Sequence, residues 1–216
     1  QVDVNLNMEL KGRTTGDDPN DFTQTVYGNG NVKHSIKDES HGTHVAGIIA
    51  AERGNGLGVD GVANNVQIMA VRAVPNGDEY DKDVALAIRY AADNGAKVMN
   101  TSFGKAYSPH SDKVREAIAY AASKDVLIVN AAGNDALDLD KNKSYPNDAV
   151  DNGAEVADNF VTVGALAPSN GEDVVASFSN YGKINVDVFA PGAKIYSTTP
   201  ENEYDTKGGT SMAAPA

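Results

Sequence analysis

The last residues of the chain contain the clearest candidate for a catalytic nucleophile. Ser211 follows Gly208, Gly209 and Thr210 and precedes the run Met-Ala-Ala-Pro at 212–215. Because these neighbours are small, a backbone and a substrate can approach the serine oxygen closely. Taken alone, the stretch fits two readings equally: a nucleophilic serine, or a tight turn that leads into an alanine-rich helix.

Two histidines near residue 40 are the candidates for a partner base. His41 and His44 lie three positions apart, as two metal ligands on one helical face would. The glutamate of a His-Glu-x-x-His zinc motif is missing, so the pattern disfavours zinc. The small neighbours Gly42, Thr43 and Gly47 leave His44 room to face a cleft, where an imidazole can accept a serine proton. The alternative is a histidine whose hydrogen bonds are satisfied in the core.

Three further patterns fail on their context. Residues 56–61 match Gly-x-Gly-x-x-Gly, but they follow a helix and precede a strand, the reverse of a dinucleotide site, so a turn is predicted. Residues 138–149 space oxygen ligands like an EF-hand loop, but Lys143 and Ala149 replace the required glycine and glutamate, which leaves a solvated acidic loop. Ser211 also resembles the nucleophile elbow of α/β-hydrolases, whose histidine follows the serine, whereas every histidine here precedes it.

Helices alternate with apolar strands along the middle of the chain. The periodicity predicts helices at 41–51, 81–94 and 111–124 and strands at 66–74, 97–102 and 126–131, with further apolar segments at 160–166, 174–178 and 186–189. This order predicts right-handed crossovers and a three-layer α/β/α fold around a mostly parallel sheet. Chemistry in such sheets lies at the carboxyl ends of the strands, where the polar residues 100–104 and 132–135 fall.

Residues 1–40 differ from the rest because they are polar and interrupted by Gly, Asn, Asp and Pro. They show no sustained helical or strand period, so we expect a loop with one short edge strand near residues 2–8. The expected organisation is a loop-like lead-in over 1–40, which is part of the same domain or the end of an insertion, followed by a domain over 41–216.

The composition limits the classes of function. The 216 residues carry a net charge of -12, which repels a nucleic-acid backbone, so no nucleic-acid partner is expected. No apolar run approaches the roughly 20 residues needed to span a bilayer, so no membrane segment is expected in this chain. The absence of cysteine rules out a disulfide, a thiolate metal site and a cysteine nucleophile.

Four blocks of the sequence resemble those of the subtilisin-like serine proteases, the subtilases. Residues 41–47 and 209–215 resemble the signature blocks around the family's histidine and serine. Residues 130–135 look like the block with the oxyanion asparagine, and residues 101–104 look like the substrate-binding strand. The blocks occur in the family's order and the resemblance covers about residues 38–216, which makes the match specific.

The resemblance implies a serine endopeptidase with a subtilisin-like fold. It makes Ser211 the nucleophile, His44 the general base and Asn134 the side-chain donor to the oxyanion, together with the backbone N–H of Ser211. No cofactor is required for this chemistry. The implied partner is a peptide or protein substrate, and the family's habits imply a secreted or cell-envelope location and a monomer when the protein is complete.

The resemblance also implies where a peptide would bind. Ser102, Phe103 and Gly104 would pair with an extended substrate backbone, an instance of strand addition, and residues 77–79 would form the opposite edge. The residues of the first specificity pocket, whose smallness suggests a roomy apolar slot, would be Ala131, Ala132 and Gly133. The family often holds a structural calcium ion in the loop that matches Asn55, Leu57 and Val59, but the metal is left unassigned here.

Two departures from the family's pattern concern the ends of the chain. The family's catalytic aspartate lies in a strand that ends Asp-Ser-Gly or Asp-Thr-Gly, upstream of the histidine. The upstream aspartates that lack this setting are Asp3, Asp17, Asp18, Asp21 and Asp38. At the other end, the chain stops at Ala216, one turn into the helix that starts at the serine. We therefore expect a fragment cut at both ends, with the aspartate outside it and little or no activity of its own.

Two other functions stay open beside the endopeptidase. A non-catalytic pseudoprotease would keep the groove as a peptide-binding module without turnover, and the missing aspartate leaves this alternative open. A lipase-like esterase is disfavoured by the order of histidine and serine.

Overall fold

The computed structural model describes residues 13–33, 39–75 and 77–216. The edge strand predicted near residues 2–8 lies outside the described residues. The turn predicted at 56–61 is confirmed in its first half, since residues 56–58 form bends after α2 (His41–Ala50), while residues 59–61 form no regular element.

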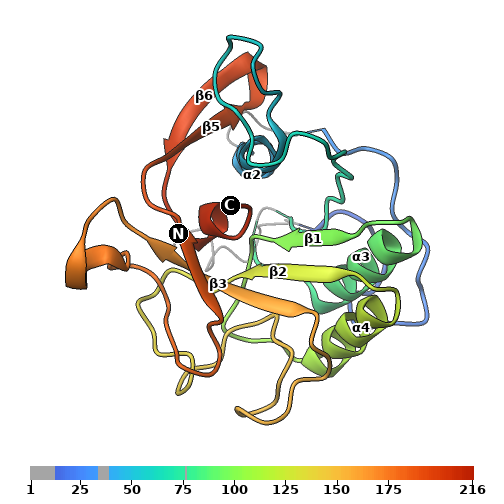
Figure 1. The fold of residues 1–216 in the computed structure, drawn as a ribbon. Helices are drawn as coiled ribbons and strands as arrows, with labels where there is room; N and C mark the ends of the chain where they lie inside the picture. Colours follow the sequence, from blue (N-terminus) through green and yellow to red (C-terminus); the bar gives the residue numbers. More distant parts are fainter. Residues whose placement is uncertain (1–12, 34–38, 76) are drawn as a thin grey trace.

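A parallel sheet lies at the centre of the molecule (Figure 1). Its strands, in spatial order, are β1 (Val98–Thr101), β2 (Leu127–Ala131), β3 (Phe160–Leu166) and β4 (Val188–Pro191). Each neighbouring pair is parallel, with Val98 opposite Leu127 and Ile128 opposite Phe160. The predicted α/β fold with a mostly parallel sheet is therefore confirmed, and the carboxyl ends of the strands lie along one edge.

Two helices cover one face of this sheet. These are α3 (Asp81–Asp93) and α4 (Ser111–Ser123), which pack against each other (Figure 1). Their apolar faces meet the sheet residues Met99, Ile128 and Phe160 in one buried cluster. Both helices were predicted within a residue of their observed ends, because their apolar residues recur at helical spacing and Gly95, at φ 88°, ends the first.

The opposite face of the sheet carries the serine turn. The short helix α5 (Thr210–Ala213) contacts β2, β3 and β4. Ala213 is buried there against Ala131 of β2 and against Val163 and Ala165 of β3. Small side chains line this contact, so the backbone of α5 lies close to the sheet.

A hairpin follows the sheet and was not predicted. It consists of β5 (Ile195–Thr199) and β6 (Glu203–Lys207), which pair in antiparallel fashion, joined by the 3-10 turn η2 (Pro200–Asn202). In β6 the residues are polar and mostly exposed, so the sequence lacks the apolar alternation that reveals a half-buried strand. Another short 3-10 turn, η1 (Gly171–Val174), falls at the start of the apolar segment predicted at 174–178.

The strand predicted at 66–74 does not form. The segment joins neither sheet, and its apolar side chains Val66, Ile68, Met69 and Val71 are exposed. A strand is defined by hydrogen bonds to a neighbour, and none of the described residues supplies one here. The prediction of a strand at 66–74 is therefore wrong for the described residues, because none of them pairs with this segment.

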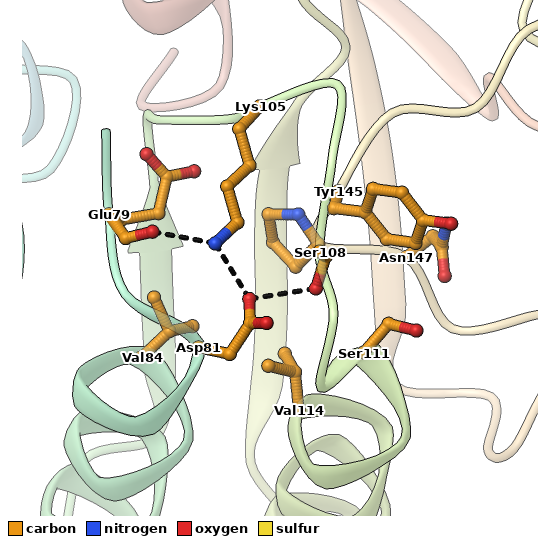
Figure 2. A pocket seen from close by; sticks show the side chains of 10 residues that line it. Glu79, Asp81, Val84, Lys105, Ser108, Ser111, Val114, Tyr145 and Asn147 are labelled. Carbon is orange, nitrogen blue, oxygen red and sulfur yellow. Dashed lines mark hydrogen bonds and ion pairs between the residues drawn. The ribbon is translucent and has the colours of Figure 1, made fainter. Parts of the chain in front are cut away.

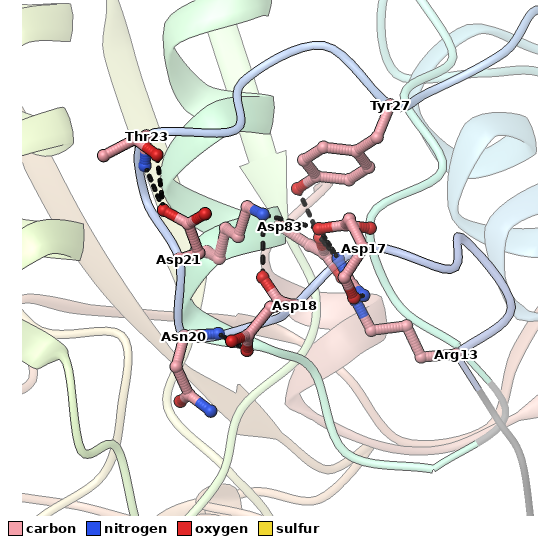
Figure 3. Close-up of polar contacts among 9 residues, drawn as sticks. Arg13, Asp17, Asp18, Asn20, Asp21, Thr23, Tyr27 and Asp83 are labelled. Carbon is pink, nitrogen blue, oxygen red and sulfur yellow. Dashed lines mark hydrogen bonds and ion pairs between the residues drawn. The ribbon is translucent and has the colours of Figure 1, made fainter.

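The described part of the lead-in, 13–33, contains no helix or strand and lies along the start of α3. Arg13 forms ion pairs with Asp17 and with Asp83 of α3 (Figure 3). The ammonium of Lys82 pairs with Asp17 and lies over the Tyr27 ring. Lys82 is fully buried, so these charges compensate one another away from water. The network fixes the loop on α3, while the division of the chain at residue 40 stays a prediction.

Candidate active site

Helix α2 (His41–Ala50) positions the candidate base. Gly47 lets this helix lie directly on β5, because a Cβ there would collide with the hydroxyls of Ser197 and Thr198. Ser197 Oγ donates to the backbone oxygen of His44 at 2.8 Å, which fixes the helix on the hairpin. His41 is exposed at the start of the helix, whereas His44 is 0% exposed.

The His44 ring has one satisfied and one unsatisfied nitrogen. Nε2 lies 3.1 Å from the carbonyl oxygen of Asp205 in β6, and because that oxygen can only accept, Nε2 carries the hydrogen. Nδ1 is buried and has no partner among the described residues. Burial lowers the pKa of His44, although the hydrogen bond to the carbonyl of Asp205 acts in the opposite direction and raises it. The imidazole is therefore neutral at pH 7, as a general base must be.

Ser211 is held by two hydrogen bonds to Ser102. Its Oγ donates to the carbonyl oxygen of Ser102 at 3.1 Å, and Ser102 Oγ donates to the carbonyl oxygen of Ser211 at 2.8 Å. Ser102 in turn accepts a bond from the Asn100 amide at 2.8 Å. The end of β1 and the start of α5 are thereby fixed to each other.

His44 and Ser211 make no hydrogen bond with each other in the part of the chain that the structure describes. Their neighbours in sequence do meet, since Val45 and Ile48 of α2 form one buried cluster with Met212 of α5. The fold thus brings the helix of His44 and the turn of Ser211 together, while the two side chains keep other partners.

Asn134 is oriented by the residue that precedes Ser211. Its Oδ1 accepts from the backbone N–H of Thr210 at 2.8 Å and from the Thr210 hydroxyl at 3.1 Å. The same hydroxyl accepts from the backbone N–H of Gly133 at 3.0 Å. Because the oxygen of the amide is occupied, its NH2 group is left as the donor, beside the N–H of Ser211 in the first turn of α5, which has no helical partner.

Asn180 is a structural residue of this site that sequence reasoning missed. It is buried, its Oδ1 accepts from the backbone N–H groups of Asp135 and Leu137, and its Nδ2 donates to the oxygen of Ala132. A Cβ on Gly133, at φ 102°, would collide with this amide. Asn180 therefore shapes the loop that carries Asn134. The only signal in the sequence was a lone asparagine after an apolar run.

The three residues expected to bind substrate directly follow the end of β1 and differ in their exposure to solvent. Ser102 is buried against Ser211, Phe103 packs on the core beneath α3 and α4, and Gly104 is exposed. Gly104 passes close to the next segment, since a Cβ there would lie 3.1 Å from the oxygen of Tyr145. The backbone of Gly104 is thus accessible from one side only.

The three residues expected to line the specificity pocket face different surroundings. Ala131 is buried in the cluster under α5, and Gly133 is held by Thr210. Ala132 borders a cavity of about 340 Å³ that Ser144 and Leu139 also line. Among these three residues the structure therefore places only Ala132 on that cavity.

Asp140, in the solvated acidic loop predicted at 138–149, forms hydrogen bonds to a distant segment of the chain. Its carboxylate accepts backbone N–H groups from Lys183, Ile184 and Asn185 at 2.8–3.1 Å. These bonds hold the pKa of Asp140 below its ordinary value. Within the predicted acidic loop, Asp140 is thus fixed by a turn distant in sequence, which supplies the donors.

Neither a metal-binding group of side chains nor a membrane-spanning helix occurs among the described residues. No group of three or more His, Asp or Glu side chains there is arranged to hold a metal ion. In the loop considered for calcium, Asn55 Oδ1 already accepts the backbone N–H of Leu57 at 2.8 Å. Among the helices that the structure describes, none is long and apolar enough to cross a membrane.

Comparison with known proteins gives similar serine proteases. A thermophilic serine proteinase of Bacillus sp. (strain AK1) is 44% identical over 178 residues, which are 82% of this chain and 40% of that protein. The cell wall-associated protease of Bacillus subtilis (strain 168) is 39% identical over 216 residues, 99% of this chain and 21% of that protein. Thermitase from Thermoactinomyces vulgaris is 39% identical and is matched over 57% of its length. The chain thus spans well under two thirds of these relatives.

Solved structures give the same likeness. Sphericase has a TM-score of 0.69 at 30% identity, over 83% of this chain and 61% of that one. A cold-adapted subtilisin-like serine proteinase has a TM-score of 0.63 at 34% identity, over 82% of this chain and 57% of that one. The sequence model of the Subtilase family matches residues 3–216. With nearly its whole length inside that match, the chain belongs to the subtilase family.

Proposed function

We propose that the complete protein is a serine endopeptidase in which Ser211 is the nucleophile, His44 the general base and Asn134 an oxyanion donor. The observation that carries the proposal is the meeting of Ser102, Asn134 and Ser211 at the start of α5 in a chain of this family. Ser211 Oγ attacks the substrate carbonyl while His44 takes its proton and later protonates the leaving amine.

The oxyanion would form between two donors. The NH2 group of Asn134 and the backbone N–H of Ser211 both lie at the start of α5, and Thr210 fixes the orientation of the amide. Donors that are fixed before the reaction stabilise the developing charge without reorganising. The binding of Asn134 to Thr210 therefore supports its proposed role.

A carboxylate from elsewhere in the protein would complete the triad. Nδ1 of His44 supports this, because it is buried, has no partner among the residues that the structure describes, and is the ring atom that such a carboxylate orients. The described upstream aspartates have other partners: Asp17 pairs with Arg13 and Lys82, Asp18 accepts from Asn20, and Asp21 accepts from Thr23. A carboxylate at Nδ1 requires a hydrogen there, which leaves Nε2 bare to accept from Ser211 and releases the oxygen of Asp205.

Labelling with a fluorophosphonate tests this function. The complete protein is expected to react at Ser211, and residues 1–216 alone are expected to react far more slowly, because the loss of the orienting carboxylate costs about 10⁴ in kcat in the trypsin case. Ser211→Ala in the complete protein is the control for site-specific labelling. Labelling of residues 1–216 as fast as the complete protein would show that no further carboxylate is needed.

A second candidate function is a pseudoprotease that binds peptides without cleaving them. The contact of His44 Nε2 with Asp205, in place of Ser211, favours it. If the complete protein does not label but still binds an extended peptide, the pseudoprotease is the correct reading. Ester and peptide substrates, compared on the complete protein, separate either function from a lipase-like esterase.

The remaining properties of the complete protein are also proposals. A substrate peptide would bind along Ser102–Gly104, with Ala131–Gly133 toward the first specificity pocket. No cofactor takes part in the chemistry, and any calcium would be structural. A secreted or cell-envelope location is supported by the name of one relative, the cell wall-associated protease, and we expect a monomer.

A further inference from the structure

We propose that Lys105 is a positioning residue that sets the spacing between the two edges of the peptide groove. The inference rests on the proposed function, in which a peptide binds along residues 102–104, and on the family resemblance, which implies that residues 77–79 form the opposite edge. It assigns to Lys105 a role in binding extended substrates, and none in the chemistry at Ser211.

The side chain of Lys105 crosses from one edge to the other (Figure 2). Its ammonium donates to the backbone oxygen of Glu79 at 2.6 Å and pairs with the Asp81 carboxylate at 2.7 Å. Lys105 itself directly follows Gly104, the last residue of the proposed substrate-binding edge. One side chain therefore ties the end of one edge to the backbone of the other.

The backbone of Lys105 is fixed independently of its side chain. Its N–H donates to the oxygen of Tyr145 at 2.9 Å, and the N–H of Tyr145 donates back at the same distance. Three residues earlier, Ser102 is bonded to Ser211. Because the segment is held at both ends, a shift in the Lys105 side chain acts on the facing edge at Glu79 and leaves Ser211 in place.

Asp81 makes this tie rigid. Besides Lys105, its carboxylate accepts from the Ser108 hydroxyl at 2.7 Å and from the backbone N–H of His110 at 2.8 Å. The side chains of Asp81 and Lys105 are 4% and 10% exposed, so water screens their attraction little. The space beside them is about 10 Å³, enough for no more than one water molecule. Asp81 thereby fixes the Lys105 ammonium within hydrogen-bond distance of the Glu79 backbone oxygen.

The test measures cleavage of short and long peptides by the complete protein. In the wild type, lengthening the substrate by residues that occupy both edges is expected to raise kcat/KM. In Lys105→Met this advantage is expected to fall roughly ten- to hundredfold, since small misplacements of binding groups cost that much. The rate of fluorophosphonate labelling at Ser211 is expected to stay at the wild-type value. Lys105→Arg, which keeps a cation with several donors, is expected to restore part of the length advantage.

Lys82→Met is the matched control. Like Lys105, Lys82 is a lysine with a mostly buried side chain that pairs with an aspartate, here Asp17. Lys82 lies in the first turn of α3, and its ammonium bonds to the lead-in loop and not to residues 102–105. This variant is expected to lose thermal stability and to keep the length advantage. If Lys105→Met does not fold, Asp81→Asn weakens the same tie from the other side and takes its place.

The outcomes are distinct. A length advantage that survives in the folded variant overturns the inference, and so does a labelling rate that falls as far as peptide cleavage, which would mean a general structural role. A wild-type protein that cleaves but gains nothing from longer substrates overturns it as well. A wild-type protein that neither labels nor cleaves contradicts the proposed function instead.

Discussion

At the scale of single residues, the site depends on which polar side-chain atoms form hydrogen bonds within the described chain and which do not. The side-chain oxygen of Asn134 accepts hydrogen bonds from Thr210, which leaves its NH2 group as a donor. The Nε2 of His44 bonds to Asp205, whereas its Nδ1 has no partner among the described residues. Buried polar atoms without partners are rare in folded proteins. Because Nδ1 has no partner in the part of the chain that the structure describes, we expect a further group of the complete protein to bind there.

Asn134 is expected to act on the chemical step. In the complete protein, Asn134→Ala should lower kcat about 10²–10³-fold with little change in KM, a magnitude measured on a member of this family and not worked out from this geometry. Asn134→Asp keeps the oxygen that accepts from Thr210 but loses the donor, so it should lose activity at least as strongly while retaining more thermal stability. Steady-state kinetics and melting curves check both, and full activity of either variant would contradict the role.

Asp148 is expected to make stability depend on pH. Burial raises its pKa to about 6, and the negative charges of Glu155 and Asp187 add to the shift. Since the folded state binds a proton more tightly, this residue's contribution to the free energy of unfolding falls as pH rises from about 4 to about 6. Asp148→Asn should therefore stabilise the protein at pH 8 by roughly 1–2 kcal/mol, after allowance for its partial exposure. Urea unfolding at pH 4 and pH 8 tests this, and an equal effect at both would contradict it.

At the scale of elements, one close contact sets the position of His44, the proposed base. Helix α2 lies on β5 because Gly47 leaves room for the hydroxyls of Ser197 and Thr198, which bond to the backbone of α2. A helix rich in small residues was visible in the sequence, but the surface that it contacts was not, because the hairpin lies about 150 residues further along the chain.

Gly47→Ala should separate α2 from the hairpin. The added methyl group has no space, so the free energy of unfolding should fall by about 1–3 kcal/mol. Gly42→Ala, on the same helix, meets nothing within 4 Å and should stabilise the helix by up to about 1 kcal/mol. Thermal melting of both variants checks the contrast, and equal melting temperatures would show that the close approach is not required.

At the scale of the whole molecule, the described chain leaves apolar surface open at one side of the sheet. In the described ranges β1 pairs with β2 alone, Val98 is 60% exposed, and Val66, Ile68 and Met69 are exposed along the extended segment. An edge strand with unpaired backbone groups and apolar side chains is a surface for another strand. We expect a further extended segment of the complete protein to cover it.

Hydrogen exchange can test whether a further segment covers this edge of the sheet. Amides of residues 66–71 and 98–101 should exchange at least about tenfold more slowly in the complete protein than in residues 1–216, because a new strand would pair with them. Amides of β2, which is paired on both sides, serve as the internal reference for folding. Equal exchange at 98–101 in the two proteins, with β2 protected in both, would contradict the prediction.

Local patterns determined much of this protein in advance. The periodicity of 81–94 and 111–124 identified α3 and α4, the apolar runs identified the strands of a parallel sheet, and the four blocks identified the family. These features depend on residues near one another in sequence, where spacing alone fixes which side chains share a face.

Tertiary structure alone decided the contacts between distant segments. It brought Ser102 to Ser211, Asn180 to the backbone of Asp135 and Lys105 to Asp81. It also left 66–74 without a paired strand among the described residues, although the pattern there predicts a strand. The physical reason is the same in each case: a hydrogen bond or ion pair needs two partners, and the sequence names each of them without saying which will meet.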